Sequence, residues 1–366
     1  MAGGRPVSGS SLLDLPAGLG QRAESVRFDV LNADRSFAFT ATQAEASVAT
    51  VSWDANATTN RTLRGVNFGP RDAARIDPTV HRLAPFWVLD DGTQWQQGLY
   101  LFSSPEFPRL AGQTFLRSDL YDQSVILAQP RESSYSLGPY SQILPALLAL
   151  AAEVGIGAQQ IAVDALSPAT TGSAPYTKPA GTTRADVMAD LCAAAGMYPP
   201  YFDNQGHLRL RSVPNPLSSA APDVAYSTGP SSRIVRDSIV TANNLATAPN
   251  RYLVIGSTSS SAEVTGYFDV PANAPHSFER RGFRVVKRVD AQGAADSEAC
   301  RVAAQAAYAT DFDAYDEVRY VTAPDPRADG FQITNFLGTN YREQSWQLPL
   351  APGGQMPHVA RKVYQP

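Results

Sequence analysis

The 366-residue sequence has few charged residues, few cysteines and no long apolar run. Asp, Glu, Lys and Arg make up 17% of it, below the roughly 25% of an average domain, so we expect a largely uncharged polar surface or extensive burial against partners. The net charge of −4 gives no overall attraction to nucleic acid or anionic membranes. The sequence contains no run of about 18 apolar residues, so no membrane span is predicted. The N-terminus lacks the pattern of a signal peptide.

Residues suited to metal binding or redox chemistry are scarce. The two cysteines, Cys192 and Cys300, each lie in a predicted helix, where we interpret them as buried small side chains rather than a disulfide or thiol metal site. The four histidines are scattered, which favours exposed or hydrogen-bonded side chains over ligands: His81, His207, His276 and His358. Acidic residues within 311–317 fit either a cation site or a solvated helix end. Because that run lacks the Gly bend and terminal Glu of a calcium loop, we favour the helix end and predict no metal or cofactor.

No catalytic motif is present. The sequence contains no Gly-x-Ser-x-Gly elbow, no His-Glu-x-x-His pair and no phosphate-binding loop ending in Gly-Lys-Ser/Thr. Gly155-Ile156-Gly157 supplies two glycines of a dinucleotide-binding fingerprint, but it follows a predicted helix and lacks the third glycine. We therefore predict that the chain is not an enzyme.

Alternating apolar and polar residues dominate both ends of the chain, which is typical of β-strands. We expect a flexible arm over residues 1–22 and a first tube-like β domain over 23–118, with a hairpin turn at 91–92. The pattern over residues 231–366 predicts a second tube-like β domain, which contains one helix over about 296–315.

Residues 119–230 form an α+β insert that ends in a Pro- and Ser-rich linker. An apolar stripe predicts a first helix over about 141–154, capped by Ser141. A second helix begins at Thr183, with Asp186 three residues later as a shortened capping box. The predicted fold class is thus α+β and β-rich: two tube-like β-barrel or sandwich domains with an inserted α+β domain containing two helices.

Five basic residues cluster in the second β region: Arg280, Arg281, Arg284, Lys287 and Arg288. Interpreted as one strand, the pattern places Arg284 and Arg288 on the same face. The charges then either protect a sheet edge or meet an acidic neighbour or a passing polyanion, so we predict a lumen or interface role. Because no aromatic stacking series accompanies them, sequence-specific reading of nucleic acid is not expected.

Short segments in three parts of the chain form a combined pattern. The first part holds Arg61-Thr62-Leu63, Leu83-Ala84-Pro85 and Asp90-Asp91-Gly92-Thr93. The second holds Tyr121-Asp122, Leu127-Ala128-Gln129-Pro130, Tyr140-Ser141-Gln142-Ile143-Leu144 and Asp203-Asn204-Gln205-Gly206-His207-Leu208. The third holds Pro324-Asp325-Pro326-Arg327, Ser345-Trp346-Gln347-Leu348-Pro349-Leu350 and Gly353-Gly354-Gln355-Met356. Together, over about residues 25–363, they resemble the baseplate hub or tail-tip minor tail proteins of long-tailed phages, of the actinophage type.

This resemblance implies a homotrimer whose two tube-like domains per chain form a pseudo-sixfold ring. The ring adapts the sixfold tail tube and the distal tail protein to a threefold tip, with further tip or fibre proteins below. Its lumen lets the tape measure protein and then DNA pass without sequence recognition. The resemblance also implies a location at the tail tip of the virion, after synthesis in the host cytoplasm. Hubs often carry a C-terminal hydrolase or fibre-anchoring extension, and because this chain stops at Pro366 we expect a purely structural adaptor.

Two other classes of function fit the composition. Four tryptophans could serve as glycan-stacking platforms in a carbohydrate-binding adhesin: Trp53, Trp87, Trp95 and Trp346. A cell-wall glycoside hydrolase would need two facing carboxylates, and no pair is marked by sequence. An adaptor forms a ring without turnover, an adhesin binds glycan as a monomer, and a hydrolase cleaves its substrate.

Overall fold

The computed structural model describes most of the chain between residues 24 and 362. The described ranges are 24–44, 48–164, 169–171, 175–213, 222–226, 232–235, 237–243, 248–257, 263–290, 296–311, 316–336 and 338–362. The expected arm over 1–22 and most of the expected linker over 215–230 lie outside them. No helix in the described part is long and apolar enough to cross a membrane.

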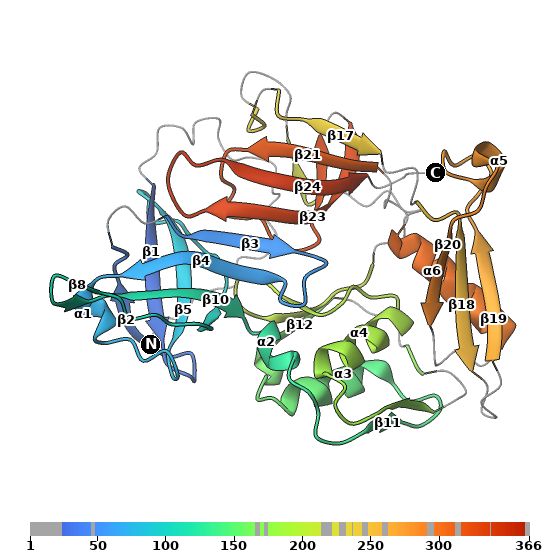
Figure 1. Ribbon diagram of the computed structural model, residues 1–366, viewed down its shortest axis with the longest axis horizontal. Coiled ribbons are helices and arrows are strands. Elements are labelled where there is room, and N and C mark those ends of the chain that lie inside the picture. Colours follow the sequence, from blue (N-terminus) through green and yellow to red (C-terminus); the bar gives the residue numbers. More distant parts are fainter. Residues whose placement is uncertain are drawn as a thin grey trace.

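One large sheet contains strands from both ends of the chain (Figure 1). Its path is β17-β21-β24-β23-β3-β4-β10-β7-β5-β1-β2, with β6, β16 and β22 attached at its sides. Its N-terminal strands are β1 (Glu24–Leu31), β2 (Phe37–Ala41), β3 (Thr50–Asp54), β4 (Arg61–Phe68), β5 (Arg82–Leu89), β6 (Gln94–Gln96), β7 (Tyr100–Phe102) and β10 (Leu116–Asp122). Its C-terminal strands are β16 (Val224–Ala225), β17 (Val240–Asn243), β21 (Asp316–Thr322), β22 (Ile333–Phe336), β23 (Thr339–Pro349) and β24 (Met356–Lys362). The short helix α1 (Pro70–Ala73) and the hairpin β8 (Arg109–Leu110) and β9 (Gln113–Thr114) lie beside it.

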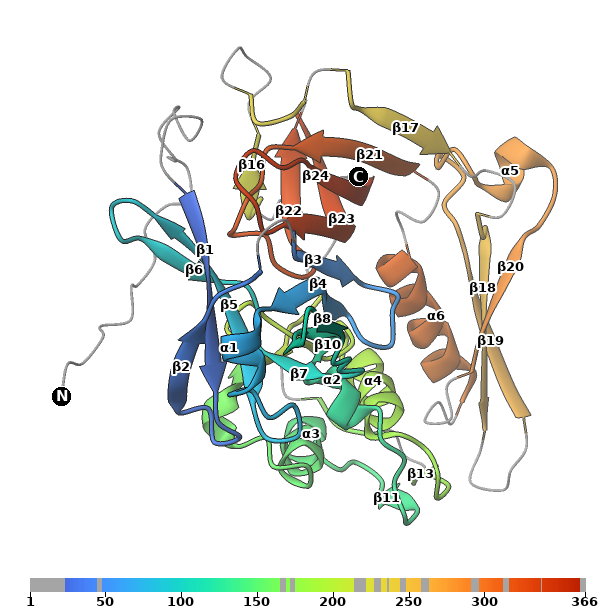
Figure 2. The ribbon, with the colours of Figure 1, turned by 60° about the vertical axis from the view of Figure 1, so that its left-hand side comes forward.

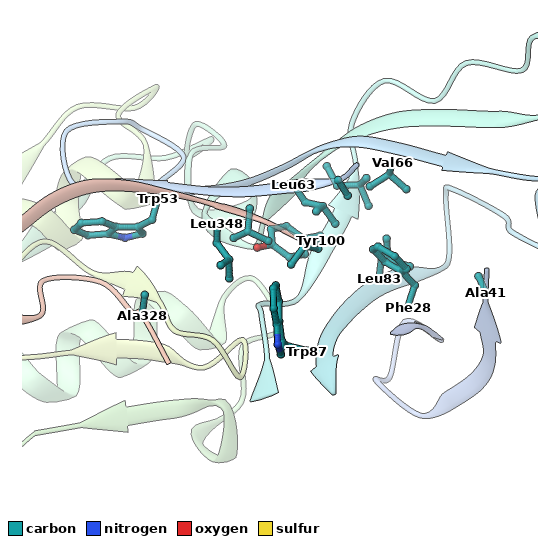
Figure 3. Packing of buried hydrophobic residues seen from close by; sticks show 14 of the residues in the cluster. Phe28, Ala41, Trp53, Leu63, Val66, Leu83, Trp87, Tyr100, Ala328 and Leu348 are labelled. Carbon is teal, nitrogen blue, oxygen red and sulfur yellow. The ribbon is translucent and has the colours of Figure 1, made fainter. Parts of the chain in front are cut away.

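The antiparallel pair β3–β23 joins the two β regions. Trp53 on β3 lies opposite Trp346 on β23, and their rings stack with centroids 6.4 Å apart, an arrangement that adds about 1 kcal/mol beyond burial. Leu348 follows Trp346 into the same core, which also holds Tyr100 and Trp87 (Figure 3). The sheet therefore crosses from the region expected over 23–118 into the region expected over 231–366.

The insert packs two helices against short strands. Its elements are α2 (Ser124–Leu127), β11 (Tyr135–Leu137), α3 (Ile143–Ala152), the 3₁₀ turn Ala158–Gln160, β12 (Ile161–Val163), β13 (Tyr176–Lys178), α4 (Arg184–Ala194), β14 (Tyr201–Phe202) and β15 (Leu208–Leu210). The predicted cap of the second helix is confirmed, because the Thr183 hydroxyl accepts the Asp186 N–H at 3.0 Å. The predicted Ser141 cap is wrong: α3 begins two residues later, and the Ser141 N–H donates to Thr171 Oγ1 at 2.9 Å.

Residues 248–311 form a separate small module that the sequence did not reveal. A three-stranded sheet, β19 (Glu263–Asp269), β18 (Arg251–Ser257) and β20 (Val286–Asp290), packs against α6 (Ser297–Asp311) around its own core, and α5 (Phe278–Arg281) precedes β20. In Figure 2, α6 lies between this sheet and the rest of the molecule. The expected helix over 296–315 is confirmed in type and ends earlier, and the expected acidic run is divided between α6 and β21, with 312–315 outside the described residues.

The predicted β-rich α+β class is confirmed. The large sheet is an open path within the described residues, with β17 and β2 at its two ends. No closed barrel appears in that part of the chain, so the expected tube-like barrel form is not seen there.

Gly266 on β19 sets how closely α6 approaches the module sheet. A Cβ atom there would lie 2.6 Å from Arg301 N and 2.7 Å from Ser297 O, both backbone atoms of α6. We predict that Gly266→Ala destabilises the protein by about 1–3 kcal/mol because the helix must move, measured by urea unfolding and by loss of amide-exchange protection on β18 and β19. Gly69→Ala is the control: no atom lies within 4 Å of its added Cβ, so a change below about 0.5 kcal/mol is expected. Equal effects of the two substitutions would contradict the prediction.

Candidate functional site

One buried arginine connects the three large parts of the chain. Arg61, the first residue of β4, is fully buried. Its guanidinium group donates to Asn204 Oδ1 in the insert and, at 2.6 Å, to Asp329 Oδ1 in the loop before β22. It also lies 5.2 Å from the ring centroid of Trp346 on β23. A buried charge stabilises the folded protein only when its charged and polar partners are in place. Arg61 therefore specifies how the three parts of the chain meet.

The insert reaches this junction through the turn of its hairpin β14–β15. Asp203 accepts the backbone N–H groups of Gln205 and His207 at 2.9 and 2.8 Å, which is the side-chain-to-backbone bonding that stabilises such turns. Gly206 takes a φ of 75°, a backbone conformation that glycine adopts without strain. The side-chain amide of Asn204 donates to the backbone carbonyl of Ala328 at 2.8 Å. The backbone carbonyl of Asn204 accepts the Gly98 N–H. The turn is therefore bonded to both β regions.

Aromatic rings fill the junction around Phe331. Its ring stacks on Tyr198 at 4.3 Å and meets Tyr201 and Trp53 edge-on at 5.2 and 5.1 Å. Phe331 has a φ of 52°, which costs a non-glycine residue about 1 kcal/mol or more. Gly330 before it has no Cβ, and a Cβ there would come within 2.8 Å of Tyr201. The packing of the three rings holds this strained loop in place.

The loop before β22 also contains a buried carboxylate. Asp325 is almost fully buried and makes two hydrogen bonds with the Arg327 side chain, at 2.9 and 2.8 Å. Arg233 adds a third at 3.3 Å. Burial raises the pKa of Asp325, but the bonds and charges of Arg327 and Arg233 outweigh it and hold that pKa below its ordinary value. The loop thus keeps its charge compensated inside the protein.

Asp122 is a buried acid next to this junction with weaker compensation. It ends β10 and is 1% exposed; its Oδ1 accepts the Ser124 N–H and hydroxyl. Its Oδ2 has no hydrogen-bond partner among the described residues. Burial raises its pKa to about 6, against the opposing bonds from Ser124 and the charge of Arg61. The folded state therefore disfavours the ionised form of this carboxyl group.

The structure brings one histidine and one acid together, but in a closed environment. His358 Nδ1 lies 3.3 Å from Glu343 Oε2, and its Nε2 lies 3.0 Å from Thr322 Oγ1. Both side chains are 2% exposed, and the imidazole stacks on Tyr320. The expectation of a hydrogen-bonded histidine is confirmed here. No group of three metal-ligating side chains occurs within the described ranges.

The expected basic strand is divided among three elements: Arg280 and Arg281 end α5, Arg284 lies in the next turn, and Lys287 and Arg288 lie on β20. The single-strand prediction is wrong because Gly282, with a φ of 71°, ends α5 and reverses the chain. Aromatic residues do accompany the arginines: Arg281 lies over Phe283 and Arg284 over Phe278. The lumen or interface role of the five residues stays a prediction.

Three of the four tryptophans are in the core. Trp53, Trp87 and Trp346 are each 1% exposed, so they cannot stack on a glycan. Trp95 is partly buried against the same core. This placement removes the main observation behind the carbohydrate-binding alternative.

No protein-family model and no curated protein matches the chain, whereas solved structures do. A tail protein from Neisseria meningitidis is 12% identical, with a TM-score of 0.63 over 92% of this chain and 96% of that chain. The prophage MuSo2 43 kDa tail protein from Shewanella oneidensis is 10% identical, with a TM-score of 0.61 over 93% and 98%. The E. coli c3393 protein, a type VI secretion component described as similar to T4 phage tail proteins gp27 and gp5, is 8% identical, with a TM-score of 0.52 over 94% and 77%. The chain has the fold of phage tail proteins.

In this tail-protein fold, some of the junction residues come from the segments that carried the resemblance. Arg61, the turn over 203–206 and the loop beginning at 324 were all noticed in the sequence, yet nothing in their spacing showed that they meet. Asp329 and Phe331 carried no sequence signal at all. In β4, which also carries Thr62, Arg64 and Asn67, no sequence signal set Arg61 apart as the buried arginine.

We predict that Arg61→Ala lowers the free energy of unfolding by about 3 kcal/mol or more, since it leaves Asp329 and Asn204 without their cation. Urea unfolding followed by the fluorescence of the buried tryptophans measures this. Arg64→Ala is the matched control, because Arg64 is exposed on the same strand, and it should change stability by less than about 0.5 kcal/mol. If both variants unfold like the wild type, Arg61 does not hold the junction.

We predict that Asp122 makes stability depend on pH. Its pKa rises from 3.8 to about 6 on folding. Its favourable contribution to the free energy of unfolding is therefore complete below pH 4 and is lost as the pH rises through 6. A shift of that size corresponds to about 3 kcal/mol. Asp122→Asn keeps an acceptor for Ser124 and should be more stable than wild type at pH 7, with a flatter pH profile between 4 and 7 in urea titrations. An unchanged profile would contradict the assignment.

Proposed function

We propose that the chain is a structural hub protein of a phage tail tip, in which three copies form a ring. The observation that carries this proposal is the similarity of its fold to phage tail proteins along more than nine-tenths of the chain. The rigid junction supports it, because a part that transmits load between other proteins needs its own domains locked together. The presence of two β regions in each chain supports a pseudo-sixfold ring that adapts the sixfold tail tube and distal tail protein to a threefold tip.

The two ends of the large sheet favour assembly into a ring. β2 and β17 form the two edges of the sheet path within the described residues, and both expose large apolar side chains, Phe37 at 61% and Val240 at 55%. Such edges invite pairing with another chain. When the two ends of one subunit differ, head-to-tail contacts close into a ring if the rotation allows.

The remaining features of the proposal follow from a hub role. The ring encloses a lumen for the tape measure protein and then for DNA, with further tip or fibre proteins below. The chain acts in the virion tail tip after synthesis in the host cytoplasm, without catalysis and without a cofactor. The actinophage type of hub, expected from the sequence, is part of this proposal.

We predict that the purified chain forms trimers, seen by native mass spectrometry and light scattering, and that the assembled particle shows threefold density for it at the tail tip. Trp95→Ala should leave both unchanged, because the partly buried ring is not a glycan platform. A stable monomer that binds glycan and loses that affinity on Trp95→Ala would instead support an adhesin. Release of sugars from cell walls by the purified chain would support a hydrolase.

A further inference from the structure

Two arginines share one neutral acceptor where the insert meets the first β region. Arg35 lies in the turn between β1 and β2, and Arg82 is the first residue of β5. Arg35 Nη2 and Arg82 Nη1 both donate to Gln123 Oε1, at 3.0 and 3.2 Å. Arg35 Nη2 also donates, at 3.0 Å, to Gln160 Oε1 in the 3₁₀ turn of the insert. Two positive charges are therefore held next to each other by amide oxygens, and we call them the arginine pair.

The positive charge of the arginine pair has no carboxylate partner. Within the described residues, neither guanidinium group forms an ion pair. Asp34, the neighbour of Arg35 in the chain, accepts the Ser36 hydroxyl and N–H instead. Burial lowers the pKa of Arg82, and burial and the charge of Arg82 lower the pKa of Arg35, against the opposing charge of Asp203. A negatively charged group beside the pair would thus be stabilised by both cations.

The backbone places Arg35 at this point under strain. Its φ is 69°, a conformation that non-glycine residues rarely adopt and that is frequent at binding sites. The turn is closed by the Asn32 N–H, which donates to the Ser36 carbonyl, and by the Arg35 N–H, which donates to the Asn32 carbonyl, each at 2.9 Å. The turn therefore fixes the direction from which the Arg35 side chain reaches the insert.

We propose that the arginine pair binds a small oxyanion of the phosphate class at the contact between the insert and the first β region. Among the described residues, no hydrogen bond uses Arg35 Nη1 or Arg82 Nη2, so both guanidinium groups keep donors for a ligand. Planar guanidinium groups match the geometry of phosphate oxygens. Both side chains are half-buried, which favours a small free ion over the backbone of a nucleic-acid duplex.

A bound anion would strengthen the contact between the two parts of the chain. Arg35 and Arg82 belong to the first β region, whereas Gln123 leads into the insert and donates through Nε2 to the Gly206 carbonyl at 3.1 Å. Because an anion between the arginines offsets their mutual repulsion, it stabilises the arrangement in which both reach Gln123. This inference does not depend on the proposed ring.

The test is a titration of the full chain with inorganic phosphate, at one pH and with the ionic strength kept constant by chloride. We expect calorimetry to detect binding, and the melting temperature to rise with phosphate concentration because the ligand binds the folded state. Arg82→Gln and Arg35→Asn should each weaken binding at least about tenfold, as the loss of a hydrogen bond to a charged group does. Asn tolerates the positive φ at position 35. The two substitutions lie on different elements, so misfolding of one leaves the other as the test.

Arg64→Gln is the matched control, because Arg64 is exposed on β4 of the same β region, and it should bind phosphate like the wild type. Three results would overturn the inference. In the first, the wild type binds no phosphate. In the second, phosphate raises the melting temperature of all variants equally, which is a general effect of the salt on burial. In the third, a DNA duplex displaces phosphate from the wild type, so that the ligand is a nucleic-acid backbone rather than a free ion.

Discussion

The arrangement of this protein depends on one fully buried guanidinium group. Arg61 reaches a turn of the insert, a loop of the second β region and the face of Trp346 at the same time. A buried cation is costly without partners, so this side chain permits only arrangements in which all three segments are present. The strained backbone at Phe331 and the short contact distances around Gly330 are tolerated because that arrangement is so constrained.

The continuous sheet has consequences for function. Because β23 pairs with β3, the two β regions cannot rotate independently, and they form one continuous sheet with β17 at one end and β2 at the other. A rigid element of this kind suits the proposed hub role, in which the subunit would connect a tail tube to a tip. The insert and the small module then lie outside the sheet path (Figure 1), where they can add contacts without interrupting the sheet.

Elements whose bonds are local were predictable, and elements set by distant residues were not. Thr183 caps α4 through a residue three positions away, and Gly155 and Gly196 take positive φ angles just after helices. The start of α3, by contrast, depends on Thr171 about thirty residues later. The basic cluster was seen but assigned to one strand, because alternation alone does not show that Gly282 ends a helical turn within it.

The sequence by itself determined the β-rich α+β class, the helical insert and the scarcity of reactive residues, because these depend on composition, periodicity and short-range bonding. Only the tertiary structure decided that the two β regions share a sheet, that residues 248–311 form a module of their own, and that Arg61, Asn204 and Asp329 meet. Their separation in the chain is large, up to 268 residues between Arg61 and Asp329. Such contacts form because packing and charge compensation select them, and neither is encoded in local spacing.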